Sequence, residues 1–152
     1  PADKASFTPE CSRSDIENCS DQEIINVYDN TIAYTDFVLA KTIKVLEQYQ
    51  DNYNVALVYL SDHGESLGES GIYLHGTPYS IAPSQQTHVP WFLWLPQEYT
   101  QAKGVDRECI AEHAQTASYS HDNLFHSLLG LYGVNTSVRD AALDITSNCK
   151  LT

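Results

Sequence analysis

The sequence predicts an α/β fold in which helices flank a mainly parallel sheet. A long amphipathic pattern over residues 21–49 is followed directly by an unbroken apolar run at 55–60. An apolar run without polar alternation is typical of a central strand buried on both faces of a parallel sheet. A second apolar run, bounded by prolines, covers residues 89–96. A helix followed by a buried strand is half of an α/β repeat, so the pattern favours this class.

Length and charge limit the possible roles of the chain. Its 152 residues, 42% of them apolar, are enough for one domain or one piece of a larger domain. The net charge of −12 argues against nucleic acid as a partner, since phosphate recognition needs an excess of Lys and Arg. No apolar run approaches the roughly 20 residues that span a bilayer, and the polar N-terminus does not resemble a signal peptide. Because the chain begins at Pro1 and contains no Met, we expect it to be a fragment.

The four cysteines favour disulfides and an oxidising compartment, because their number is even. Cys11 and Cys19 are near enough in sequence to close a small loop. Cys109 and Cys149 would then close a large loop and pin the C-terminal tail. The alternative is a zinc site made of cysteines, although the spacings contain no pair of cysteines separated by two residues.

The predicted elements follow in order from the N-terminus. Residues 1–19 form an irregular loop. Ser20 and Glu23 form a capping box, in which each side chain bonds the other residue's backbone N–H, and this predicts the start of the helix at 21–49. Residues 51–54 break that helix before the strand at 55–60.

The second half of the chain carries a long loop and shorter elements. Residues 61–88 are polar and rich in Gly, Ser and His, and long ordered loops in compact domains are usually functional. Ser120 is placed to cap the last helix, and Gly133 lies at its C-terminal cap position. The remaining expected elements are the strand 89–96 and the helices 97–104, 106–117 and 121–132.

The strongest chemical feature is the segment 61–65, Ser-Asp-His-Gly-Glu, directly after the predicted strand. In open α/β sheets, ligands bind at the carboxyl ends of the strands. Asp62 and His63 offer an oxygen and a nitrogen ligand, and Gly64 allows a sharp turn. Zinc takes such ligands, usually four in total, so the others must come from elsewhere. The alternative is a hydrogen-bonded structural pair.

Two further histidines lie in the same loop. His75 and His88 can bind a second metal as neutral imidazoles, or hold a phosphate oxygen when charged. Alternatively, His75 organises the loop and His88 only shapes the chain before the next strand. The carboxylates of the loop are Asp62, Glu65 and Glu69.

Four other residues could be taken for site residues but are not assigned a catalytic or metal-binding role. Thr77 lies beside the loop histidines, but nothing around it supplies a base, so we do not assign it as a nucleophile. Surface or capping roles are expected for the histidines on the predicted helices, His113, His121 and His126.

Several segments of the chain resemble one known protein family. Residues 61–69 and 71–76 strongly resemble the lipid A phosphoethanolamine transferases, which include the mobile colistin-resistance enzymes. Four other segments are also similar to that family, so the resemblance runs nearly from end to end: 7–11, 25–30, 86–90 and 120–126.

The resemblance implies a larger parent protein. Members of this family have an N-terminal membrane domain and a periplasmic catalytic domain with the alkaline-phosphatase/sulfatase-like α/β fold. Residues 1–152 would then be the C-terminal part of that catalytic domain, on the periplasmic side of the bacterial inner membrane. The membrane domain and the N-terminal half of the catalytic domain would be absent.

The resemblance also implies site residues. Asp62 and His63 match an Asp-His pair that binds zinc together with a Glu and a nucleophilic Thr. His75 matches a histidine that binds the substrate phosphate or a second zinc, and Glu65 matches an acidic residue near the site. The pair Cys11–Cys19 matches a family disulfide. The family's Glu ligand, its Thr and a further His precede the Phe-Thr-Pro motif, so we expect no catalytic nucleophile in this chain.

The implied reaction is zinc-dependent transfer of phosphoethanolamine from phosphatidylethanolamine to a lipid A phosphate through a phospho-Thr intermediate, which gives polymyxin resistance. The alternatives are a phosphoglycerol transferase, a sulfatase, or a non-catalytic periplasmic binding module. We expect the isolated chain to be inactive and to bind Zn²⁺ weakly. An unpaired sheet edge would also favour a dimer.

Overall fold

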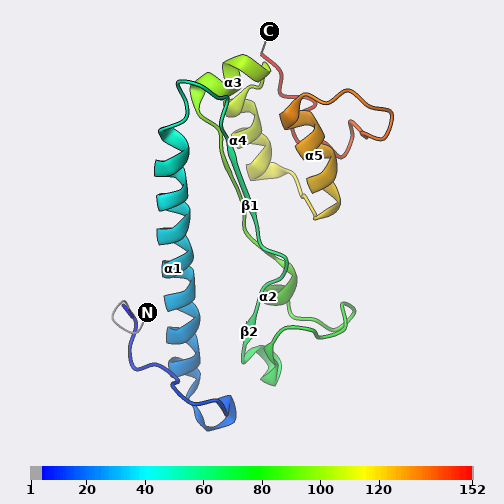
Figure 1. The fold of residues 1–152 in the computed structure, drawn as a ribbon. Coiled ribbons are helices and arrows are strands. Elements are labelled where there is room, and N and C mark those ends of the chain that lie inside the picture. The colour runs from blue at the N-terminus through cyan, green and yellow to red at the C-terminus, as the bar shows by residue number, and fades with distance from the viewer. Residues whose placement is uncertain (1–4, 152) are drawn as a thin grey trace. The chain divides into compact units, whose positions relative to one another are not determined.

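The chain divides into two compact units, described here from a computed structural model that covers residues 5–151. The first unit comprises residues 1–46 and 58–93, and the second comprises residues 47–57 and 94–152. In Figure 1 the first unit contains the long blue-to-cyan helix α1, and the second contains the helices α3, α4 and α5.

Helix α1, Asp21–Glu47, begins at the predicted capping box. The Ser20 backbone N–H donates to Glu23 Oε2 at 2.8 Å, and the Glu23 backbone N–H donates to Ser20 Oγ at 3.4 Å. The bond from the Ser20 backbone, with a second bond from its hydroxyl, lowers the pKa of the Glu23 carboxyl. The helix ends two residues before the predicted position 49, where the chain enters turns.

Two asparagines one helical turn apart hold the N-terminal segment against α1. Asn30 accepts from the backbone N–H of Phe7 at 3.0 Å through Oδ1, and its Nδ2 donates to the Phe7 carbonyl at 2.9 Å. Asn26, which is buried, donates to the Pro9 carbonyl at 2.8 Å. A short 3₁₀ helix, Ile16–Asn18, follows in the predicted irregular region. Backbone groups that a loop leaves unpaired are thus satisfied by helix side chains.

The two apolar runs form the strands β1, Leu57–Leu60, and β4, Trp91–Trp94, which pair with each other. The Ser61 N–H donates to the Pro90 carbonyl at 3.2 Å, so the end of β1 lies beside the start of β4. The two strands therefore run in opposite directions (Figure 1), which an apolar run does not reveal. The residues of β1 are half-buried instead of buried on both faces, because this sheet has two strands in the described part of the chain.

A small hairpin orders the long loop between these strands. Strand β2, Ser66–Leu67, pairs antiparallel with β3, Tyr73–Leu74, in the register Ser66 to Leu74. The Tyr73 hydroxyl donates to Asp21 Oδ1 at 2.7 Å, and this bond raises the pKa of Tyr73. The other elements of the loop are the 3₁₀ helix Glu69–Gly71 and the short helix α2, Ser84–Thr87.

The second unit contains the three predicted short helices, with ends within one residue of expectation. They are α3, Gln97–Lys103, α4, Arg107–Thr116, and α5, Asp122–Tyr132. Gly133 ends α5 in the left-handed region, at φ 73°, as predicted. The Ser120 hydroxyl accepts from the Asp122 N–H at 3.2 Å, which agrees with its expected capping role.

The second unit has its own apolar core. Tyr99 donates from its hydroxyl to the Leu131 carbonyl at 2.6 Å, and burial raises the pKa of Tyr99 to about 12. A backbone bridge between Val105 and Lys150 attaches the C-terminal tail. The buried apolar side chains are Leu95, Tyr99, Val105, Ile110, Leu131, Ile145 and Cys149.

Both predicted disulfides are present, Cys11–Cys19 in the first unit and Cys109–Cys149 in the second. The second one joins α4 to the C-terminal tail. Within residues 5–151, no helix combines the length and the apolar character needed to cross a membrane.

Candidate metal centre

Two histidines and a glutamate from the loop between β1 and β4 converge in the first unit. His63 and Glu65 follow β1 directly, and His75 follows β3. Because Ser66 pairs with Leu74, the residues just outside that pair, Glu65 and His75, lie opposite each other. The hairpin therefore brings together side chains that are ten positions apart in sequence.

The distances in this cluster suit a metal ion. His75 Nδ1 lies 2.7 Å from Glu65 Oε1, and the rings of His63 and His75 stack with centroids 3.9 Å apart. One possible ligand atom from each of the three residues lies within 4.8 Å of the other two. Two imidazole nitrogens and a carboxylate oxygen form a common zinc ligand set.

The buried oxygen of Glu65 supports the assignment of a ligand site. Glu65 Oε2 is buried and has no hydrogen-bond partner, which is costly for a carboxylate oxygen. His63 Nδ1 lies 3.0 Å from the Gly64 carbonyl, and an N–H at this nitrogen would leave Nε2 as the ligand atom. Zinc-binding histidines typically bond a carbonyl in this way. The residues present therefore fit a zinc ion.

Asp62 lies apart from this cluster. Its side chain is 90% exposed, and its Oδ1 accepts from the His63 backbone N–H at 3.1 Å. The same oxygen is 3.9 Å from His63 Nε2. The sequence predicts His63 and Asp62 as a pair of metal ligands, whereas the structure groups His63 with Glu65 and His75.

Gly64 is required by a close contact and not by a left-handed turn. A Cβ at this position would lie 1.9 Å from the Gln85 carbonyl oxygen, which is far inside contact distance. The Gly64 N–H donates to the Gln86 carbonyl at 3.0 Å. The role of Gly64 is therefore steric: the missing side chain lets the segment after β1 pack against α2.

Gln86 holds the loop together from α2, and nothing in the sequence marks it as buried. Its Nε2 donates to Ser66 Oγ at 2.9 Å and to Thr77 Oγ1 at 3.1 Å. Its Oε1 accepts from the Thr77 N–H at 3.2 Å. The Thr77 hydroxyl is thus engaged in a structural contact, in agreement with its rejection as a nucleophile. A polar residue in a four-residue helix gives no periodic signal of burial.

A polar groove of about 390 Å³ runs beside Glu65. His88 lies on this groove and not in the cluster of His63, Glu65 and His75, and its own side chain is exposed. The Glu69 carboxylate, also on the groove, accepts from the Leu67 N–H at 2.7 Å. The full lining is Tyr28, Glu65, Leu67, Glu69, Ser84, Gln85 and His88.

The histidines of the second unit have separate environments. His126 is half-buried and its Nδ1 accepts from the Asp140 N–H, and His121 occupies the position directly before α5. His113 Nδ1 lies 3.5 Å from the Sγ of Cys149, a contact that its place on a predicted helix does not suggest.

Comparison with known proteins gives consistent matches. The family described as Sulfatase matches residues 1–134. The chain is 52% identical to the phosphoethanolamine transferase EptA of Salmonella typhimurium over 144 residues, which are 95% of this chain and 26% of that protein. It thus spans about a quarter of the length of this relative.

Solved structures of similar proteins share the fold. The integral membrane lipooligosaccharide phosphoethanolamine transferase A of Neisseria meningitidis superposes with a TM-score of 0.93 at 39% identity, covering 100% of this chain and 28% of that chain. The C-terminal periplasmic domain of phosphoethanolamine transferase EptC from Campylobacter jejuni gives a TM-score of 0.85 at 44% identity, covering 100% and 47%.

Proposed function

The chain belongs to the sulfatase family, and from this premise we propose that the protein containing it transfers phosphoethanolamine from phosphatidylethanolamine to a phosphate of lipid A. The similar proteins named above are phosphoethanolamine transferases, and the chain spans 26% of the length of one of them. The activity is therefore proposed for the whole protein. Polymyxin resistance would follow, because the added ammonium group offsets negative charge on lipid A.

The single observation that carries this proposal is the convergence of His63, Glu65 and His75, with Glu65 Oε2 buried and unpaired. A zinc ion held at this cluster through His63, with Asp62 as a further ligand of the same ion, would supply Lewis-acid polarisation of the phosphoryl oxygen. Asp62 is exposed and close to His63 Nε2, so it remains in reach of such an ion. His75, oriented by Glu65, would bind a phosphate oxygen or a second zinc.

The groove beside the cluster supports ethanolamine as the transferred group. Glu65 and Glu69 both line it, and two carboxylates suit the ammonium of phosphoethanolamine. A sulfate ester or a phosphoglycerol group has no positive charge to match them. This charge pattern favours the transferase over the sulfatase and phosphoglycerol transferase alternatives.

The nucleophile of the phospho-Thr intermediate is proposed to lie outside these 152 residues. Thr77, the threonine nearest to the cluster in sequence, is bonded to Gln86. The isolated chain should therefore release no diacylglycerol from labelled phosphatidylethanolamine, and measurable release would contradict this assignment. The isolated chain should also bind Zn²⁺ weakly in calorimetry, because part of the proposed ligand set is missing.

The two disulfides support a periplasmic location for this part of the protein, since disulfides persist in oxidising compartments. The membrane attachment of the whole protein is proposed from the family resemblance.

Mass spectrometry of lipid A tests the function in cells that express the full-length gene. The wild-type protein should add the mass of phosphoethanolamine, and His63→Ala and Asp62→Ala should abolish the addition. His126→Gln, in the second unit, is the matched histidine control and should retain it. Unchanged product from His63→Ala would disprove the role of this cluster, and an added phosphoglycerol mass would disprove the proposed donor.

A further inference from the structure

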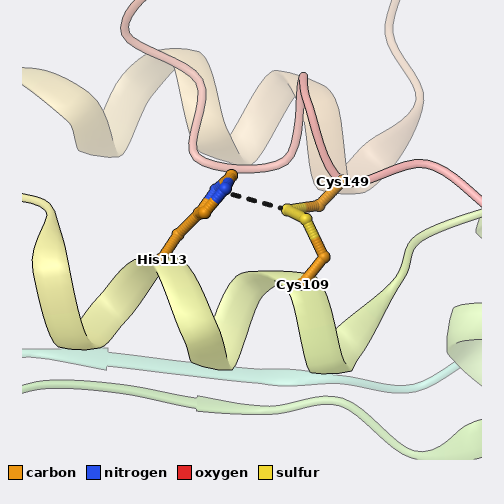
Figure 2. Close-up of side chains that lie close together, drawn as sticks. All are labelled: Cys109, His113 and Cys149. Carbon is orange, nitrogen blue, oxygen red and sulfur yellow. Dashed lines mark hydrogen bonds between the residues drawn. A yellow bond between two sulfur atoms is a disulfide. The ribbon is translucent and has the colours of Figure 1, made fainter.

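A second cluster of possible metal ligands lies in the second unit, independent of the activity proposed above. Cys109 and His113 lie one turn apart on α4, so they face the same side of the helix. Cys149 comes from the C-terminal tail and meets both of them (Figure 2). One possible ligand atom from each residue lies within 4.8 Å of the other two.

The disulfide state decides whether this cluster can bind a metal. Cysteine binds metal ions as a thiolate, and the sulfurs of Cys109 and Cys149 are joined in a disulfide. We propose that reduction of this disulfide converts Cys109, His113 and Cys149 into a binding site for Zn²⁺, with water as the fourth ligand. The cluster would then connect α4 to the tail covalently when oxidised and through the metal when reduced.

The distances agree with this proposal. With a Zn–S distance of about 2.3 Å and a Zn–N distance of about 2.0 Å, a sulfur and a nitrogen on one tetrahedral zinc ion lie roughly 3.5 Å apart. His113 Nδ1 already lies 3.5 Å from Cys149 Sγ. Two thiolates on such an ion lie roughly 3.8 Å apart, so the main change needed is a separation of the two sulfurs by side-chain rotation.

Backbone bonds hold the three residues in place without the sulfur–sulfur bond. The Asp106 N–H donates to the Cys149 carbonyl at 2.9 Å, and the Leu151 N–H donates to the Gly104 carbonyl at 3.0 Å. The Asp106 side chain caps α4 by accepting from the Cys109 N–H at 3.1 Å. Cys149 is only 1% exposed, so its side chain lies in the interior of the second unit. The ligands are therefore organised before any metal arrives.

The redox step balances with a phosphine reductant. The phosphine takes the oxygen atom of one water molecule, two electrons pass to the disulfide, and the two water protons end on the two thiols. Zinc binding then releases the thiol protons. A dithiol protein that performs thiol–disulfide exchange is the corresponding biological class of reductant, and it is oxidised to its own disulfide.

Cobalt titration of the 152-residue chain tests the site. The double variant Cys11→Ser/Cys19→Ser removes the other thiols, and phosphine reduces the remaining disulfide. Co²⁺ should then produce a thiolate-to-cobalt charge-transfer band that saturates at one equivalent and disappears when Zn²⁺ is added. Without reduction the band should be absent. Adding His63→Ala and His75→Ala should leave the band unchanged, because those ligands contain no sulfur.

His113 provides the specific test of the third ligand. His113→Ala should weaken zinc binding by roughly tenfold or more, since loss even of an outer-shell partner costs 10–100-fold. His126→Gln is the matched control and should bind like the parent. Three results would overturn the proposal: no cobalt band after reduction, equal affinity in His113→Ala, or a reduced chain whose circular dichroism shows that it has unfolded before metal is added.

Discussion

At the scale of single residues, one buried hydroxyl joins two helices of the second unit. Tyr99 on α3 donates to the Leu131 carbonyl on α5. We expect Tyr99→Phe to lower the free energy of unfolding by about 1–2 kcal/mol, because a buried carbonyl loses its donor. Urea denaturation followed by circular dichroism measures this. Tyr132→Phe, at a residue that is 72% exposed, is the control and should change stability little.

The same tyrosine gives a dependence on alkaline pH. Its pKa is raised from 10.0 to about 12, so the folded state favours the protonated phenol. The contribution of Tyr99 to stability is complete below pH 10 and is lost as the pH rises from 10 towards 12. Tyr99→Phe should flatten this part of the stability profile, and an unchanged profile would contradict the assignment.

The capping box gives a dependence on acidic pH. The pKa of Glu23 lies below its usual 4.5, so the folded state favours the carboxylate. Its contribution is present above pH 4.5 and is lost as the pH falls through the lowered pKa. Glu23→Gln should reduce the loss of α1 helicity on acidification, measured by circular dichroism. Glu17→Gln, outside the box, should behave like the parent chain.

Residue types and spacing predict the members of the candidate metal cluster but not how they are grouped. His63, Glu65 and His75 are all candidate ligands in the sequence, because the segment after the strand is rich in residues that bind metal ions. Their grouping depends on the register of β2 and β3, which two-residue strands do not encode in any periodic pattern. The hydrogen bonds from Gln86 to Ser66 and Thr77 could not be predicted either, because Gln86 lies in a four-residue helix that shows no periodic pattern of burial.

At the scale of elements, α5 packs closely on the turn that follows it. A Cβ at Gly130 would lie 2.1 Å from Asp144 Oδ2 and 2.6 Å from Thr146 Oγ1. Asp144 is buried and ion-paired with Arg139, so it has little freedom to move. Gly130→Ala should therefore lower the free energy of unfolding by about 1–3 kcal/mol in urea. Helix propensity alone predicts a gain of about 1 kcal/mol, so a stabilised variant would refute the packing argument.

Helix boundaries were predicted well and strand direction was not. Ser20 and Gly133 form the expected caps of α1 and α5, and the N-terminal end of α4 is set by Asp106, whose side chain caps the helix although the predicted helix 106–117 includes this residue. The orientation of β1 against β4 depends on how the loop 61–88 returns, which is a long-range property. The predicted mainly parallel sheet is therefore not seen in the pair β1 and β4, whose strands run in opposite directions.

At the scale of the whole molecule, the two units differ in how much apolar surface they bury. The buried apolar side chains of the described residues all belong to the second unit. Helix α1, in contrast, leaves several large apolar side chains exposed. Those on α1 are Ile32, Tyr34, Phe37, Val38 and Val45. The predicted dimer of this chain through a sheet edge stays a prediction.

This difference predicts a gradient of local stability. Amides of α4 and α5 should exchange with deuterium more slowly than amides in the middle of α1, because exchange follows local opening where few apolar contacts are buried. Hydrogen exchange read by mass spectrometry measures this on the 152-residue chain. Equal protection in α1 and α5 would show that the apolar surface of α1 is covered in solution, and light scattering would then identify a dimer.

The disulfide between Cys109 and Cys149 also has a mechanical consequence. It closes a covalent ring over a sequence separation of 40, which contains most of α4 and all of α5. If the chain is pulled from its two ends, this ring transmits the force through the sulfur–sulfur bond. The chain inside the ring, which has a contour length of roughly 140 Å at about 3.5 Å per residue, therefore cannot be extended by the applied force until the bond is reduced.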